Sequence, residues 1–176
     1  MSIAAWVRPA LRARLGFVPR ELWHGERPWS ILTASFVHEG GLHFVVNALA
    51  LAVFGARAER TLGAVRATGT LLACGIGAFA ADAVTDPSGQ AVRFGASGLA
   101  AAALGLALGL EPDGALRLGP TRLPVLAVAL ALVGAQLADI VAHGLAGPAV
   151  IHLAGFALGG VAAGVRHLAV RRRHAT

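Results

Sequence analysis

Long apolar stretches alternate with short polar connections along most of this chain. Residues 40–56, 67–81, 94–110, 123–138 and 140–165 contain no Asp, Glu or Arg. Each stretch approaches the roughly 20 residues that an α-helix needs to cross about 30 Å of bilayer hydrocarbon. The connections are rich in Pro and Gly, which end helices. The pattern therefore predicts five membrane helices, at about 41–56, 67–84, 94–110, 123–142 and 148–166.

The two ends of the chain are basic. Residues 1–28 carry five Arg, and the amphipathic spacing of Trp6, Leu11 and Leu15 predicts a helix that lies on the membrane surface without spanning it. This stretch lacks an apolar core of signal-peptide length, so we expect no cleavable signal. We predict an interfacial stretch at 1–28, a membrane domain at 29–170 and a basic tail at 171–176.

Composition also indicates a lipid solvent. Charged residues make up 14% of the chain, against about 25% in ordinary soluble domains, and the mean hydropathy is +0.69. The net charge of +6 comes from Arg alone, and these Arg residues gather at the ends of apolar segments. That placement favours membrane anchoring over nucleic-acid binding. The single cysteine, Cys74, excludes an intramolecular disulfide and a metal site built on cysteines.

The distribution of arginines predicts the orientation in the membrane. Nine Arg fall in the connections near 57–66 and 117–122 and in the C-terminal segment, against six on the opposite side. The positive-inside rule then places these connections in the cytoplasm. A chain dominated by Ala, Gly and Arg without Lys is typical of a GC-rich bacterial source, so we expect a multi-pass protein of the bacterial inner membrane.

Polar side chains inside membrane helices are costly and are functional candidates by default. His43 and Asn47 are four residues apart and share one face of the first predicted helix. Ser97 lies between two glycines at the start of the third, and His152 lies one turn into the fifth. These four residues are the candidates for chemistry.

Ser97 is expected at a recessed helix N-terminus. Residues 94–110 give a helix of at most about 25 Å, shorter than the bilayer core. Water could therefore reach the hydroxyl, while the free backbone N–H and the helix dipole favour negative charge, as an oxyanion requires. A nucleophilic serine also needs a base within hydrogen-bond reach, and His152 is the leading candidate.

Small residues provide a route by which the serine and the histidine could meet. Gly155, Gly159 and Ala163 continue the face of His152, while Ala101 and Gly105 continue the face of the serine, so the two helices can approach closely. His43 and Asn47 could then donate hydrogen bonds to the oxyanion. Asp82 and Asp139 lie near helix ends without a position that demands a third catalytic role, so a Ser/His pair is the simpler interpretation.

Three motifs, in this order, resemble those of rhomboid intramembrane serine proteases. The first is the run from Thr33 to Asn47, TASFVHEGGLHFVVN, followed by Glu59 and Gly63. The others are the sequence GASG around Ser97 and the sequence HLAG that starts at His152. The resemblance covers about residues 22–166. It implies an all-α, polytopic rhomboid-like bundle that here has five candidate helices and lacks the first helix of the six-helix family core.

The resemblance also implies roles for individual residues. Ser97 would be the nucleophile, His152 the base, and His43, Asn47 and the Ser97 backbone N–H the oxyanion hole, with His38 and Gly95 lining the cavity. The expected activity is endopeptidase cleavage of transmembrane or membrane-adjacent segments of membrane proteins in the bilayer, with no metal or organic cofactor. The Trp-Arg pair common in the family appears here as Arg27-Pro28-Trp29, so the contribution of the arginine is displaced or lost.

Other interpretations of the same residues stay open. Ser97 could cap a helix, His152 could be an interhelical donor, His43 and Asn47 could be polar contacts between helices, and His38 could be interfacial. A non-catalytic rhomboid-like protein that binds and escorts membrane proteins is the first alternative function. A small transporter whose polar residues line a path is the second.

Overall fold

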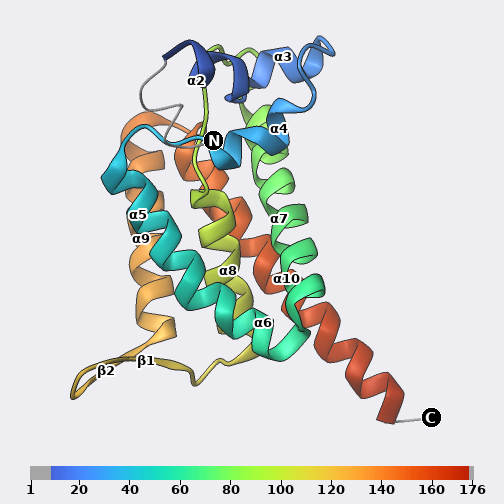
Figure 1. Cartoon of the computed structure of the whole chain (residues 1–176), viewed down its shortest axis with the longest axis vertical. Helices are drawn as coiled ribbons and strands as arrows, with labels where there is room; N and C mark the ends of the chain where they lie inside the picture. Colours follow the sequence, from blue (N-terminus) through green and yellow to red (C-terminus); the bar gives the residue numbers. More distant parts are fainter. Residues whose placement is uncertain (1–8, 175–176) are drawn as a thin grey trace.

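The computed structural model describes residues 9–174, as a helical bundle with a cap of short helices at one end (Figure 1). The cap consists of α2 (Pro9–Leu15), α3 (Pro19–Trp23), α4 (Ser30–Thr33) and a 3-10 turn, η1 (Ala34–Phe36). The sequence predicted one surface helix in this region, whereas the structure has two short ones, α2 and α3, separated before Pro19. Trp6, which contributed to that prediction, lies outside the described residues.

The bundle contains all five predicted helices. Its elements are α5 (Gly41–Ala50), a π-helical turn η2 (Leu51–Gly55), α6 (Ala56–Leu62), α7 (Ala64–Thr85), α8 (Ser97–Leu110), α9 (Val125–His143) and α10 (Pro148–His174). The rod formed by α5, η2 and α6, together with α7, α9 and α10, gives four helices that are long and apolar enough to cross a membrane. Several helices extend past their predicted ends because charged residues continue a helix into water at no cost to the buried part.

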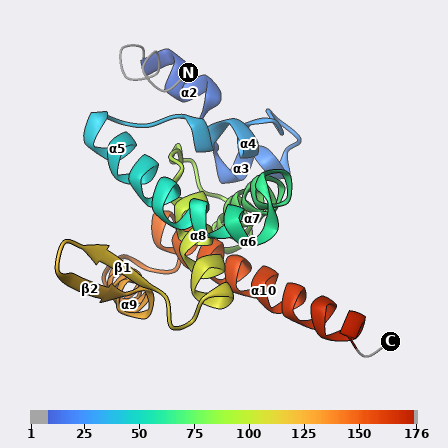
Figure 2. The same ribbon diagram turned by 60° about the horizontal axis from the view of Figure 1, so that its bottom comes forward.

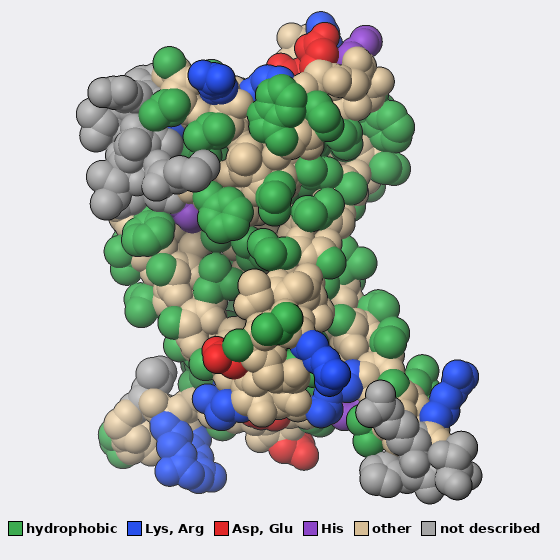
Figure 3. All heavy atoms as spheres, turned by 45° about the vertical axis from the view of Figure 1, so that its right-hand side comes forward, with side chains coloured by type: hydrophobic (Ala, Val, Ile, Leu, Met, Phe, Trp, Pro, Cys, Tyr) green, Lys and Arg blue, Asp and Glu red, His purple; other side chains and the backbone are tan. Residues whose placement is uncertain are grey.

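The surface of the bundle matches a membrane setting. Apolar side chains form a belt around the middle of the molecule, and charged side chains gather at its two ends (Figure 3). Leu42, Leu130 and Val141 are among the exposed large apolar residues, with 63% to 88% of their surface accessible. Exposure on this scale is expected where lipid, not water, surrounds the helices.

Helix α8 forms the centre of the bundle. It has 14 residues, about 21 Å of helix, and every residue from Gly98 to Ala107 is buried. The surrounding helices enclose it from several sides (Figure 2). An apolar helix of Ala, Gly and Leu suits this position, since small side chains let neighbouring backbones approach. The predicted short third helix is therefore both present and central.

A β-hairpin in the connection between α8 and α9 was not predicted. Strands β1 (Ala115–Leu118) and β2 (Thr121–Pro124) pair antiparallel, with Arg117 opposite Arg122. Gly119, with φ of 62°, forms the turn. The hairpin lies at the same end of the molecule as α6 and the end of α10 (Figure 1). This is the clustering of arginine-bearing connections that the predicted orientation requires.

The cap is fastened by Arg27. Its guanidinium donates to the carbonyl oxygens of Ala13, at 2.6 Å, and Arg14, at 2.9 Å, and pairs with Glu21. A cation is favourable there because the carbonyl groups at a helix C-terminus lack partners. Arg27 thus stabilises the end of α2 in this structure.

Candidate active site

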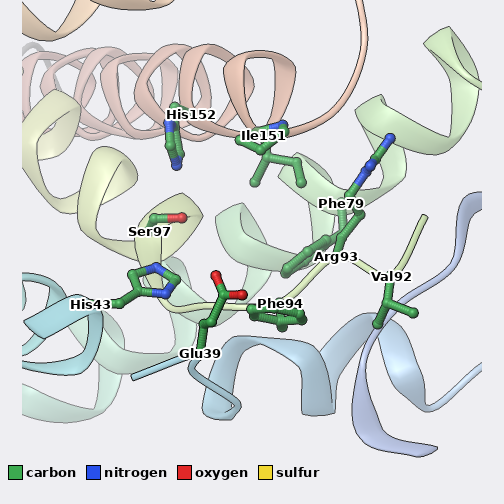
Figure 4. A pocket seen from close by; sticks show the side chains of 10 residues that line it. Glu39, His43, Phe79, Val92, Arg93, Phe94, Ser97, Ile151 and His152 are labelled. Atoms are coloured by element: carbon green, nitrogen blue, oxygen red, sulfur yellow. The ribbon is translucent and has the colours of Figure 1, made fainter. Parts of the chain in front are cut away.

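A cavity near the capped end of the bundle is bordered by both Ser97 and His152. It has a volume of about 300 Å³, and its lining also includes His43, Glu39 and Arg93. Figure 4 shows Ser97 at the start of α8, His152 projecting from α10 and His43 projecting from α5 toward the same space. Three helices that are distant in sequence thus bring together the serine and the two histidines.

Backbone hydrogen bonds fix the loop that leads into Ser97. Phe17 N–H donates to Arg93 O at 2.9 Å, and Arg93 N–H donates back to Phe17 O at 2.7 Å. Gly95 N–H donates to the carbonyl oxygen of Ala34 at 2.9 Å. Ser97 is then the first residue of α8, where N–H groups have no partner within the helix. The cap therefore sets the position of the hydroxyl and of the backbone N–H of Ser97.

Gly95 admits the His43 ring beside the serine. Its φ is 117°, a conformation that residues with a Cβ rarely adopt. A Cβ at this position would lie 2.8 Å from Cε1 of His43 and 3.7 Å from Oγ of Ser97. Gly95 was predicted to line the cavity, but it is not among the residues that border the cavities containing Ser97. Its contribution is to let the His43 ring pack against the loop backbone.

His152 is held by Gln136, a residue that was not predicted from the sequence. Its Nδ1 lies 2.9 Å from Oε1 of Gln136 on α9. Ser97, His152 and Gln136 also border a second cavity, of about 270 Å³, together with Asn47 of α5. The ring nitrogen left for Ser97 is therefore Nε2.

Asn47 lines this second cavity with an unsatisfied donor. The side chain is 5% exposed, and its Nδ2 has no hydrogen-bond partner among the described residues. A buried donor without an acceptor costs about 1–3 kcal/mol. Such a group is expected where a ligand or a reaction intermediate supplies the acceptor.

His38 does not line the cavity that contains Ser97, contrary to the prediction. It is 3% exposed and borders a separate cavity of about 170 Å³. Its ring packs edge-on against His43, with centroids 5.1 Å apart, and its Nε2 accepts from the N–H of Ala96 at 3.2 Å. Burial, and to a smaller extent the neighbouring His43, lower the pKa of His38 from its ordinary value of 6.5. His38 thus supports the loop from behind as a neutral imidazole.

Asp82 connects the two elements that carry Ser97 and His152. The carboxylate is completely buried near the end of α7 and forms an ion pair with Arg93, in the loop before α8. Its Oδ1 accepts from the N–H of Gly147, just before α10, at 2.5 Å. Asp139, the other carboxylate considered, pairs with the exposed His143 one turn along α9. No group of three or more His, Cys, Asp or Glu side chains in residues 9–174 could hold a metal ion.

Close packing of α8 on α10 explains how Ser97 and His152 come together. A Cβ on Gly155 would overlap the carbonyl oxygen of Gly98, and one on Gly159 would overlap that of Ala102. Gly105 likewise faces the backbone of α10. The predicted contact of small faces is therefore present. Ala101, however, borders the second cavity, because the face of α8 that meets α10 begins at Gly98.

The sequence contained a signal that Gln136 and Asp82 need polar partners. Gln136 is an uncharged polar residue within the apolar helix α9, and Asp82 lies in an apolar helix of 22 residues. Burying either polar side chain in a membrane costs free energy unless a polar partner is present. Asp82 was named as a candidate without a role, whereas Gln136 was missed; the partners of both depend on the tertiary structure.

These features define a multi-pass helical membrane protein in which a serine and two histidines border a cavity between the helices. The family model of the rhomboid domain matches residues 25–169. RHOMBOID-like protein 5 of Arabidopsis thaliana is 32% identical over 100 residues, which make up 57% of this chain and 32% of the plant protein. The match thus spans about a third of that relative's length. The chain belongs to the rhomboid family.

Proposed function

We propose that this protein is an intramembrane serine endopeptidase that cleaves transmembrane or membrane-adjacent segments of other membrane proteins. The observation that carries the proposal is the convergence of Ser97, His152 and Asn47 around one cavity, where the amide donor of Asn47 has no partner among the described residues. Membership of the rhomboid family supports the same activity.

The first chemical step is acylation of the serine. His152 Nε2 takes the hydroxyl proton while Ser97 Oγ bonds to the scissile carbonyl carbon, giving a tetrahedral oxyanion. The backbone N–H of Ser97, the Asn47 amide and the His43 ring donate hydrogen bonds to that oxygen. Collapse breaks the C–N bond, and His152 returns the proton to the leaving amine.

The second step is hydrolysis of the acyl-enzyme. His152 takes a proton from a water molecule as its oxygen attacks the ester carbonyl, and the same three donors stabilise the second oxyanion. The ester C–O bond then breaks, and the proton goes to Ser97 Oγ. None of these steps calls for a metal or an organic cofactor.

The second cavity provides a path for the substrate. Its walls include Val46 and Ala50 of α5, and Val128 and Leu132 of α9. An unwound transmembrane segment that enters between these helices would bring its carbonyl to Ser97 from the lipid side.

We also propose an orientation and a domain division. The end that bears α6, the hairpin and the tail at 171–176 would face the cytoplasm of a bacterial cell, and the capped end would face outward. The arginine distribution supports this arrangement, because positive charge favours the cytoplasmic side. Residues 1–28 would lie on the side of this membrane that faces away from the cytoplasm, and residues 29–170 would form the catalytic domain.

The test is cleavage of a transmembrane reporter by purified protein in proteoliposomes. Ser97→Ala and His152→Ala should reduce cleavage to background, and Ser97→Ala should abolish labelling by a fluorophosphonate probe. Ser88→Ala and His143→Ala, which alter an exposed serine and an exposed histidine, are the matched controls and should keep the parent rate.

Each alternative predicts a different result. If folded Ser97→Ala cleaves the reporter like the parent, the protease assignment is wrong. If the parent binds membrane proteins but neither cleaves the reporter nor reacts with the probe, the non-catalytic escort function replaces it. Solute flux into the same proteoliposomes would instead support a transporter.

A further inference from the structure

Gln136 is the hydrogen-bond partner that the structure gives to His152. Its Oε1 lies 2.9 Å from Nδ1, and both side chains border the cavity that contains Ser97 and Asn47. The two residues lie on different helices, α9 and α10, so this bond is a tertiary contact. An uncharged amide in the apolar helix α9 needs a partner, and His152 is that partner.

The bond selects one form of the neutral imidazole. A neutral histidine has one N–H and one lone pair on its two ring nitrogens. An amide oxygen beside Nδ1 requires the proton to lie on Nδ1, so the lone pair lies on Nε2. With Nδ1 engaged by Gln136, Nε2 is the ring nitrogen left for Ser97, and only an unprotonated nitrogen can accept the hydroxyl proton.

The bond also becomes stronger during the reaction. When His152 takes the proton from Ser97 the ring becomes cationic, and hydrogen bonds from ionised donors are roughly twice as strong as neutral ones. An acceptor at Nδ1 therefore stabilises the protonated state more than the resting state. A neutral amide provides this without a permanent negative charge in the membrane.

We propose that Gln136 is a positioning residue for the base, which fixes the tautomer and the ring orientation of His152 through Nδ1. This inference rests on the proposed protease function. It assigns to an amide the orienting task that a carboxylate performs in a three-residue catalytic arrangement. Asp139, one turn further along α9, is instead paired with His143.

The position of α9 then controls the alignment of the base. The buried residues of α9 are Val125 and Ala129, close to its start, whereas Leu137 and Val141, beyond Gln136, are exposed. The half of α9 that carries Gln136 is therefore loosely packed, and within residues 9–174 its polar link to another helix is the bond to His152. A displacement of this half would release the ring.

The experiment compares Gln136→Leu, which removes the acceptor, with Gln136→Glu, which retains one. Leu137→Ala, a change at a lipid-exposed neighbour, is the matched control. We expect Gln136→Leu to lower kcat about 10- to 100-fold with KM nearly unchanged, since the whole contribution of a general base is about 10²- to 10⁴-fold. Gln136→Glu should recover much of the loss, and Leu137→Ala should match the parent.

The pH profile separates positioning from a structural role. The rate of Ser97 labelling by a fluorophosphonate should be measured from about pH 5 to about pH 9, the range in which histidines titrate. The pH of half-maximal rate should fall in Gln136→Leu and rise in Gln136→Glu, because a better acceptor at Nδ1 favours the protonated ring. His43, Asp139, Glu39 and Arg93 are the other titratable or charged groups near His152, and none of these substitutions changes them.

The results distinguish failure of this inference from failure of the protease assignment. If Ser97→Ala or His152→Ala is active, the proposed function is wrong regardless of Gln136. If both are inactive but Gln136→Leu keeps the parent kcat and pH profile, the positioning role alone is overturned. A loss of thermal stability with an unshifted pH profile overturns it too. If Gln136→Leu does not fold, the pH profile of Gln136→Glu tests the positioning role instead. An unshifted profile in that variant overturns the role.

Discussion

Arg93 and Asp82 form an ion pair in which Nε lies 3.0 Å from Oδ2, and the carboxylate is completely buried. The same carboxylate accepts the N–H of Gly147. One side chain at the end of α7 thereby fixes both the loop that precedes Ser97 and the start of the helix that carries His152. The distance between the two candidate catalytic groups therefore depends on a residue that touches neither.

Substitution of Asp82 by Asn should destabilise the protein. The amide can still accept from Gly147, but Arg93 loses its buried counter-charge, and breaking a buried pair costs about 3–5 kcal/mol. We expect the lower end of that range, because Arg93 also pairs with Asp86. Thermal unfolding in detergent measures the effect. Asp86→Asn, at a partly exposed partner, should cost about 1 kcal/mol or less, and equal losses in the two variants would contradict the assignment.

Substitution of Asn47 by Leu should separate activity from stability. If the amide serves the oxyanion, kcat should fall by about 10²- to 10³-fold. Because Nδ2 has no partner among the described residues, unfolding stability should not fall and should rise by up to about 1 kcal/mol. Reporter cleavage and thermal unfolding on the same preparation measure both. A clear loss of stability would instead identify Asn47 as a polar contact between helices.

Two adjacent glycines of α10 should respond in opposite ways to alanine. A Cβ at Gly159 meets the backbone of α8, so Gly159→Ala should separate the helices, cost about 1–3 kcal/mol and lower cleavage. A Cβ at Gly160 meets nothing within 4 Å, so Gly160→Ala should be neutral or stabilise by up to about 1 kcal/mol. Unfolding midpoints of the two variants test the packing directly, and similar midpoints would rule out the tight contact.

Acidification should weaken the fold through His38. Its pKa in the folded protein lies below the ordinary value of 6.5, so below about that pH the unfolded chain binds more protons than the folded one. The contribution of neutral His38 to the free energy of unfolding is therefore fully present above this pH. It falls as the pH decreases toward the lowered pKa. Protonation also removes the acceptor of Ala96 N–H, a bond worth about 1 kcal/mol.

His38→Gln is the control for this pH dependence. The amide oxygen can accept from Ala96 but does not titrate, so the fall in unfolding midpoint below about pH 6.5 should become shallower in this variant. A parent-like pH dependence in His38→Gln would assign the effect to other groups.

The sequence by itself determined the number and type of the helices in the bundle. Hydrophobic runs and helix-breaking residues are local properties of the chain, so five helices, the short third one among them, could be predicted. The order of the three motifs also indicated the family before any geometry was known. Ser97, His152, His43 and Asn47 could be named as candidates because a polar group in a membrane helix needs a reason to be there.

Only the tertiary structure decided which polar groups meet. The bonds of Gln136 to His152 and of Asp82 to Arg93 and Gly147 depend on how the helices pack and where their ends lie, which no local period encodes. The same holds for His38, which lies behind the loop and not in the cavity with Ser97, and for the hairpin at 115–124. The physical reason is that the apolar or polar character of its own residues decides whether a segment forms a helix in lipid. Side-chain pairing, in contrast, depends on how helices that are far apart in the sequence pack together.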